Sequence, residues 1–436
     1  MPIAWTADQV LALAPDAGSI AAGRKLSGPG PWSGTGTRED AAVWGECAGS
    51  GKHPYRTVVD LGGPAYRCSC PSRKFPCKHA LGLLLLWSAG QVRPGTPPEW
   101  AGTWLAERAT RPPAAAQSGV SDPAAARKRV ERRGERVAAG VDELDRWLLD
   151  QVRGGLAALQ QGGYSYVEPM AARMVDAQAP GLASALRRLP GAGAGQPDRS
   201  GPLLEGLALL RLAVTAHRGL DRLPPSLAAC VRREVGYPIA KDDVLAGPPV
   251  ADRWQVVGRR DDEQERLTVR RVWLRGERTG RPALVLSFAG AGQQLDASLA
   301  AGLTVDADLH FYPGTAPLRA LVGTRRGAPE PIGTLRGGSL QDAAAAYAAA
   351  VAADPWTYSW PVVVGGLTPV PGPVWQAYDG GGRRVRLLGG DELYRLLAVS
   401  GGHPVTVAAD YTPGGLRPVS VLDADPGRAA GQLVLL

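Results

Sequence analysis

Three cysteines and one histidine lie within twelve residues of this chain, and this cluster constrains the fold more than any other sequence feature. Cys68, Cys70, Cys77 and His79 form the pattern C-x-C, six residues, C-x-H. The whole chain of 436 residues holds only five cysteines and five histidines. Three thiolates and one imidazole form a donor set that binds zinc tetrahedrally. The sequence therefore predicts one structural zinc ion held by these four side chains.

The residues around the cluster predict how the chain brings the four donors together. Side chains two apart on a strand point to the same face, so Cys68 and Cys70 at a strand end would direct both sulfur atoms one way. Two prolines bracket the next loop, and an apolar helical stretch follows at about residues 80–87. Residues two apart in a helix point to different sides, so Cys77 and His79 would straddle the start of that helix.

Four basic side chains lie between or beside the predicted ligands: Arg67, Arg73, Lys74 and Lys78. They would lower the thiol pKa values and offset the formal charge of −1 that three thiolates give to a Zn²⁺ site. We predict that the same four residues contact a partner or a nucleic acid. Cys47 and His53 precede the cluster and could serve as spare ligands, but either would exceed the four ligands already present.

Two other interpretations of the cluster compete with a metal site. The thiols could be buried structural residues beside a core histidine, which is the better explanation for a single cysteine. The C-x-C pair could also be redox-active, although nothing nearby resembles the βαβ context of a thioredoxin-like motif. Three cysteines and a histidine so close together, in a chain poor in both, favour the metal. Five cysteines in a chain of this length also exclude a disulfide framework.

The cluster and its flanks resemble the SWIM zinc finger. In that family the ligands lie on a short β-hairpin followed by a helix, and residues 55–67 fit the hairpin, with alternating strand residues and a Gly-Gly-Pro turn. Residues 44–55 and 71–76 are similar to a bacterial subfamily of SWIM proteins, whose longer C-terminal region is similar to residues 140–330. This resemblance implies the four zinc ligands, and it implies a MoxR-like AAA ATPase or a von Willebrand factor A-type (VWA-type) protein as partner.

Length and composition limit the class of protein. At roughly 150 residues per domain, the chain predicts two to four domains. The net charge of +8 is mild and does not by itself indicate a nucleic-acid partner. No run of about 18 apolar residues predicts a membrane span, and the N-terminus lacks the pattern of a signal peptide. We therefore expect a cytoplasmic protein without membrane contact, and the preference for arginine over lysine is typical of a high-GC bacterial genome.

The chain predicts an α+β multidomain protein with four segments. We predict that a SWIM-type zinc finger domain at residues 1–95, with its core at about 55–90, precedes a Pro/Ala-rich linker at 96–123, a helical region at 124–235 and a mostly antiparallel β region at 236–436 with one helix near 340–352. The basic stretch 124–139 has glutamates interleaved at helical spacing, which favours a solvated helix face over a nucleic-acid arm. The acidic residues 261–263 are expected in a solvated hairpin turn.

Two functions remain open, and both are non-enzymatic. The chain contains no nucleophile elbow, metalloprotease helix or P-loop, so we expect no catalytic residues. The favoured hypothesis is a zinc-binding interaction or adaptor protein. The alternative is a zinc-dependent DNA-binding protein, because residues 1–95 carry ten Lys and Arg against six Asp and Glu. Such a protein would lose affinity steeply with added salt.

Overall fold

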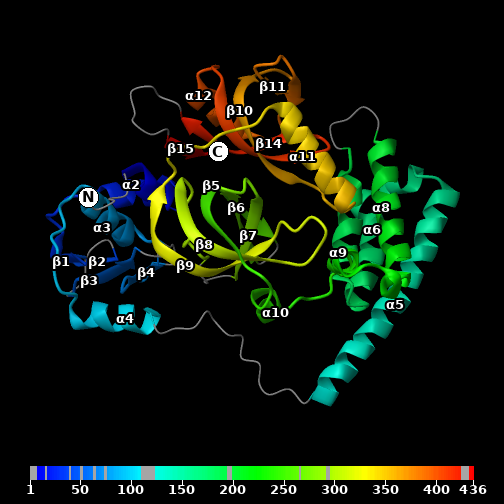
Figure 1. Cartoon of the computed structure of the whole chain (residues 1–436), viewed down its shortest axis with the longest axis horizontal. Helices are drawn as coiled ribbons and strands as arrows, with labels where there is room; N and C mark the ends of the chain where they lie inside the picture. Colours follow the sequence, from blue (N-terminus) through cyan, green and yellow to red (C-terminus); the bar gives the residue numbers. More distant parts are fainter. Residues whose placement is uncertain are drawn as a thin grey trace.

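The chain folds into three units that follow one another in the sequence (Figure 1). The computed structural model describes residues 7–14, 17–38, 41–49, 53–61, 65–72, 76–109, 123–193, 199–264, 267–290, 295–423 and 432–436. A sheet with helices comes first, a helical bundle second and two antiparallel sheets last, which confirms the predicted α+β class. No helix in these described ranges is long and apolar enough to cross a membrane.

The first unit is a four-stranded antiparallel sheet with helices on both faces. The strands lie in the order β1 (Trp32–Arg38), β2 (Ala42–Cys47), β3 (Tyr55–Asp60) and β4 (Ala65–Cys68). The helices are α1 (Ala7–Ala12), α2 (Ala17–Arg24), α3 (Lys78–Ser88) and α4 (Glu99–Ala109). Every residue of α3 from His79 to Trp87 is buried, because the sheet packs on one side of this apolar helix and α1 and α2 pack on the other.

Helix α4 differs from the predicted linker at residues 96–123. Its Ala101 and Leu105 are buried against Trp44 and Val58, on the face of the sheet opposite to α3. The Pro- and Ala-rich composition concealed this short amphipathic helix, whose apolar residues recur four apart. Residues 110–122 of the predicted linker lie outside the described residues.

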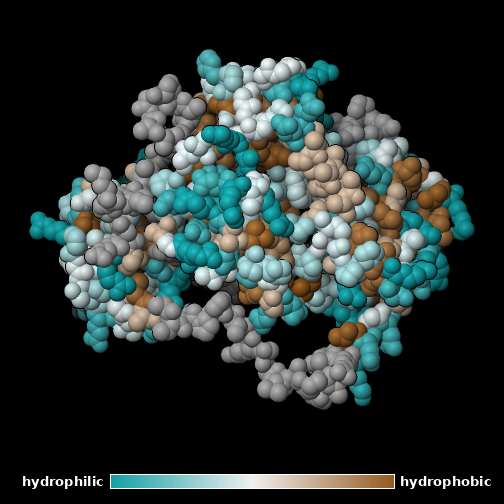
Figure 2. Space-filling model, viewed as in Figure 1, coloured by the Kyte–Doolittle hydropathy of each residue, from teal (hydrophilic) through white to brown (hydrophobic). Residues whose placement is uncertain are grey.

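The second unit is a bundle of five helices around one apolar core. They are α5 (Pro123–Gly154), α6 (Ala157–Asp176), α7 (Pro180–Arg188), α8 (Ser200–Arg218) and α9 (Pro225–Val235), with two 3₁₀ turns, η1 (Leu189–Gly191) and η2 (Leu220–Arg222). Gly181 allows α7 and α9 to touch, since a Cβ there would lie 2.0 Å from the carbonyl oxygen of Glu234. The bundle also exposes Leu204 and Leu212, and Figure 2 shows apolar patches over this part of the molecule.

The third unit contains two antiparallel sheets. The five-stranded sheet has the order β7-β6-β5-β8-β9, and the six-stranded sheet has the order β12-β11-β10-β13-β14-β15. The first sheet comprises β5 (Val250–Gln264), β6 (Leu267–Gly276), β7 (Pro282–Gly290), β8 (Leu303–Phe311) and β9 (Ala320–Pro331). The second comprises β10 (Trp360–Val370), β11 (Gln376–Tyr378), β12 (Arg384–Arg386), β13 (Val405–Thr412), β14 (Gly415–Asp423) and β15 (Gln432–Leu435).

The two sheets pack against each other through a small apolar core. Val257 and Trp273 from the first sheet meet Ala408 and Val419 from the second. The indole Nε1 of Trp273 also donates a hydrogen bond to Oδ1 of Asp410 at 3.0 Å, so one buried polar contact joins the sheets. Three helices accompany the sheets: α10 (Lys241–Leu245), α11 (Leu340–Ala353) and α12 (Asp391–Ser400). The predicted helix near 340–352 is α11, whereas α10 and α12 were missed because both are short.

The acidic residues 261–263 occupy a different place from the predicted one. They lie in β5 rather than in a solvated turn. Asp261 forms an ion pair with Arg270 on β6 at 2.6 Å, and Asp262 pairs with Arg271. Opposite charges on neighbouring strands stabilise a sheet, so the cross-strand arginines explain the acidic run.

Candidate metal centre

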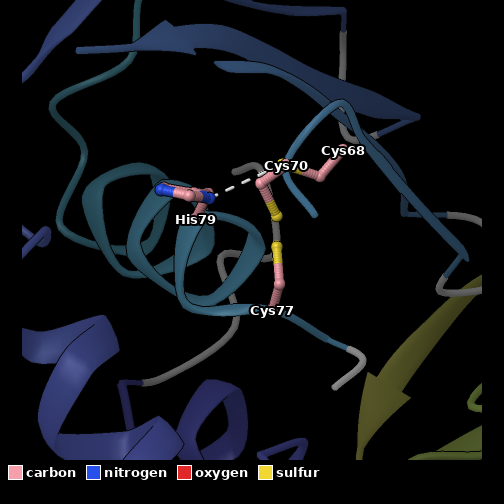
Figure 3. Close-up of side chains that lie close together, drawn as sticks. All are labelled: Cys68, Cys70, Cys77 and His79. Carbon is pink, nitrogen blue, oxygen red and sulfur yellow. Dashed lines mark hydrogen bonds between the residues drawn. The ribbon is translucent and has the colours of Figure 1, made fainter. Parts of the chain in front are cut away.

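The four predicted ligands converge where the first sheet meets α3. Cys68 ends β4, Cys70 follows it, Cys77 is the N-cap of α3, and His79 lies in the first turn of that helix. One donor atom from each residue lies within 4.8 Å of all the others. Figure 3 shows the sulfur atoms of Cys70 and Cys77 pointing toward each other, with His79 approaching from the helix. The hairpin and the helix start therefore place the donors as the sequence pattern predicts.

The helix side of the centre is more buried than the strand side. Cys77 is 1% exposed and His79 is 4% exposed, whereas Cys68 and Cys70 are half-buried. The Nδ1 atom of His79 lies 3.6 Å from the Sγ atom of Cys68. The His79 ring packs on Tyr55, with 4.7 Å between the ring centroids. The histidine orientation is thus held by an aromatic contact on one side and directed at the thiols on the other.

The thiols polarise one another strongly. The hydrogen bond from Cys77 lowers the pKa of Cys68 to about 3, helped by His79 and Thr57 and opposed by burial. The same hydrogen bond and burial raise the pKa of Cys77, while burial raises the pKa of Cys70. The hydrogen bond between Cys68 and Cys77 thus favours a thiolate at Cys68 and a thiol at Cys77. A bound zinc ion replaces these shared protons, because zinc binds thiolates.

The donor set fits one structural zinc ion. Three sulfur donors and one imidazole nitrogen complete a tetrahedron, which leaves no open position for a substrate or a reactive water. Such a four-ligand site is typical of structural zinc, whose binding contributes to the free energy of folding. The predicted cofactor, one structural Zn²⁺, agrees with this cluster.

The two spare candidates do not join the centre. Cys47 is buried in β2, where burial raises the pKa of its thiol, and its Sγ atom lies 3.6 Å from the carbonyl oxygen of Ala48. His53 is exposed on the segment before β3. Neither belongs to the cluster that the described residues form. The four-ligand set is therefore complete without them.

The four basic residues predicted around the centre are only partly described. Arg67 and Lys78 are both exposed, as expected for side chains that contact a partner. Arg73 and Lys74 lie outside the described residues. The binding role predicted for all four basic residues stays a prediction.

Sequence reasoning missed Thr57, which supports the metal centre from the neighbouring strand. Thr57 is fully buried, and its Oγ1 atom lies 3.2 Å from the Sγ atom of Cys68. The two residues are direct partners in the β3–β4 register. The register of the predicted hairpin could have identified Thr57, because directly opposed residues on neighbouring strands share a face.

A Thr57→Val variant should bind zinc about 10- to 100-fold more weakly, the usual effect of removing a group that orients a ligand. Valine keeps the volume of threonine but cannot form a hydrogen bond with Cys68. Competition with a zinc chelator measures the affinity. Thr37→Val is the matched control, since the buried Thr37 hydroxyl donates to the carbonyl oxygen of Ala42 at 2.9 Å in the same sheet. Equal zinc affinity in the two variants would contradict the role of Thr57.

Fold and site together define an α+β protein with a structural zinc centre on a β-hairpin and helix. Residues 55–87 match the family model of the SWIM zinc finger. Residues 132–235 match the model of the SWIM-associated four-helix bundle domain, which covers most of the helical unit. No curated protein and no solved structure matches the chain. The chain thus contains both SWIM-type domains, and the resemblance predicted for the cluster is confirmed.

Proposed function

We propose that this protein is a non-enzymatic adaptor whose zinc ion holds the first unit in a form that partners recognise. The observation that carries this proposal is the closed four-ligand centre at the start of the buried helix α3. Zinc there fixes the joint between the sheet and the helix, which is a structural role. SWIM zinc fingers in general mediate interactions with proteins or nucleic acids, which supports an interaction function.

The zinc-bearing unit is built into a larger body. Its apolar core includes Leu61 and Tyr66 from the first unit together with Ala300 and Leu303 from the third unit. A rigid multidomain body with an embedded finger suits an adaptor that presents several surfaces at once. The other histidines and cysteines with described contacts make structural hydrogen bonds: His217 to Tyr237, His310 to the carbonyl of Gly247, and Cys230 to Thr315.

DNA binding is the alternative function, and the exposed Arg67 and Lys78 favour it. Other charges of the first unit are already paired, since Arg56 contacts Glu46 at 3.2 Å and Arg108 contacts Asp60 at 2.8 Å. This neutralisation supports the adaptor over the DNA-binding protein. The bacterial subfamily resemblance suggests a MoxR-like AAA ATPase or a VWA-type protein in the cytoplasm as the partner.

Affinity capture from the native host tests the adaptor proposal, with Cys70→Ala and Cys47→Ala variants as paired baits. We expect the wild type and Cys47→Ala to retain the same AAA ATPase or VWA-type protein, and Cys70→Ala or chelated protein to lose it. Fluorescence anisotropy with duplex and single-stranded DNA at low salt tests the alternative. Salt-sensitive binding that weakens in Arg67→Glu and Lys78→Glu variants would establish DNA binding and refute the adaptor proposal.

A further inference from the structure

A cavity of about 640 Å³ opens beside the metal centre. It lies between α2, the segment that follows β2, the start of β3 and the metal-binding loop, and His79 and Cys70 form part of its wall. Small residues line much of the rest, including Gly18, Ala22 and Ala48. The volume falls in the range of about 300–1,000 Å³ that is usual for ligand pockets. The cavity therefore has room for a peptide of several residues next to the metal-binding side chains of His79 and Cys70.

His79 lines this cavity and has a second ring nitrogen that no described residue pairs with. Its Nδ1 atom faces the thiols, 3.6 Å from Cys68 Sγ, so metal binding through Nδ1 leaves the proton on Nε2. Figure 3 shows the second ring nitrogen pointing away from the cysteines. Nε2 has no hydrogen-bond partner among the described residues, although the side chain is only 4% exposed. A metal-bound histidine almost always donates its other N–H to a carboxylate, a carbonyl or water.

The charge around the cavity favours an acidic acceptor. Lys78 lines it with an exposed ammonium group and is the first residue of α3. The positive end of the helix dipole lies at the same place. No Asp or Glu occurs among the described residues that line the cavity, and Lys78 offsets the formal charge of −1 that three thiolates, Cys70 among them, give to the zinc-bound centre. A carboxylate there would gain a charge-assisted hydrogen bond from His79 and an ion pair with Lys78.

We propose that this cavity binds an acidic segment of a protein partner. A Glu or Asp carboxylate of the segment accepts a hydrogen bond from Nε2 of His79 and pairs with Lys78. The aliphatic part of the segment packs on Ala22 and Leu26, which line the same cavity. This assignment rests on the proposed adaptor function, and it identifies the docking site and the chemistry that the site recognises. Zinc binding and partner binding are then coupled through one imidazole ring.

Binding of a fluorescein-labelled hexaglutamate peptide to the zinc-loaded full chain tests the assignment. Fluorescence anisotropy should show binding that weakens with added salt, and hexaglutamine should not bind. Lys78→Glu should weaken binding at least about tenfold, and Ala22→Trp, which fills the cavity, should abolish it. Lys25→Glu is the matched control on the exposed side of the α2 end, outside the cavity, and should change affinity less than about twofold. Elemental analysis should show unchanged zinc content in all three variants.

NMR of the histidine ring separates a direct contact from a general charge effect. The Nε2–H signal of His79 should shift when hexaglutamate is added to the wild type and stay unchanged in Ala22→Trp. Equal peptide binding by Ala22→Trp and the wild type would overturn the proposal. An Nε2–H signal of His79 that does not shift when hexaglutamate is added to the wild type would overturn it too. Glutarate binding as tightly as the peptide would show that the site binds a free small dicarboxylic acid. This result would contradict the assignment of a protein segment as the ligand.

The two proposals fail in different ways. If host proteins are captured equally by the wild type and Ala22→Trp, and hexaglutamate does not bind, the cavity assignment is wrong while the adaptor function stands. If hexaglutamate binds as described but neither the expected partner nor any other purified host protein binds the chain, the adaptor function is wrong. The cavity would then remain a carboxylate site.

Discussion

A Cys77→Ala variant is expected to lose its zinc and to unfold the first unit of the protein. Cys77 is 1% exposed and joins the metal centre to the start of α3, so its removal leaves the cluster with three of its four donors. Structural zinc in finger peptides contributes about 10–16 kcal/mol, as much as the whole stability of a typical domain. Helix α3 then has no anchor at its N-terminus. Elemental analysis should show zinc falling from about one ion per chain to nearly none.

Hydrogen exchange locates the damage in Cys77→Ala. The amides of α3 and β3 should lose their protection, while those of the helical bundle, which has its own core, should keep theirs. Cys47→Ala is the matched control, because Cys47 is also buried in the first unit but lies outside the cluster. It should retain zinc and cost only about 1 kcal/mol for the small cavity. Protected α3 amides in a zinc-free Cys77→Ala protein would contradict a structural metal.

The metal ligands were predictable because their geometry is local. Cys68 ends β4 and Cys70 follows it two residues later, and Cys77 and His79 meet them at the start of the next helix. Thr57 was not predicted, since its contact with Cys68 depends on the register between two strands. The local pattern therefore identifies the ligands, whereas the groups that support them require the pairing of the strands.

Contacts between distant segments explain what the sequence could not reveal about the fold. The acidic run at 261–263 looks like a solvated turn until the arginines of the neighbouring strand are placed beside it. Helix α4 looks like a linker until Trp44 and Val58 supply the surface that buries its Ala101. Local composition describes each segment as it would behave alone. Its secondary structure in the folded protein also depends on residues far along the chain that bury it or pair with it.

The predicted boundary near residue 235 separates the helical region from the β region, but the structure connects them through a segment after α11. Trp356 is 5% exposed and belongs to the apolar core of the bundle, more than a hundred residues beyond the last bundle helix. Its indole Nε1 donates to the carbonyl oxygen of Leu209 at 3.1 Å. Two flanking residues also contact α9, since Asp354 pairs with Arg233 at 2.6 Å and the hydroxyl of Tyr358 donates to Glu234 at 2.7 Å.

A Trp356→Ala variant should destabilise the bundle by about 3–5 kcal/mol, the usual cost of removing a buried tryptophan side chain. It should also separate the unfolding of the bundle from that of the β region, because the indole is the apolar part of their connection. Trp356→Phe is the matched control. Phenylalanine keeps most of the packing and loses the hydrogen bond to Leu209, which should cost about 1–3 kcal/mol.

Chemical denaturation followed by circular dichroism at a helical wavelength measures these differences, and hydrogen exchange assigns them to the bundle. If Trp356→Ala unfolds at the same denaturant concentration as the wild type, the bundle is an independent module and the 354–358 segment is only a loop across its surface. If the bundle amides lose protection in Trp356→Ala while those of the β region keep theirs, the substitution has separated the two units. Trp356 then joins them into one cooperative body in the wild type. The proposed adaptor function would use such a joint, because packed contacts between units can carry coupling from a partner bound at one end to the other end.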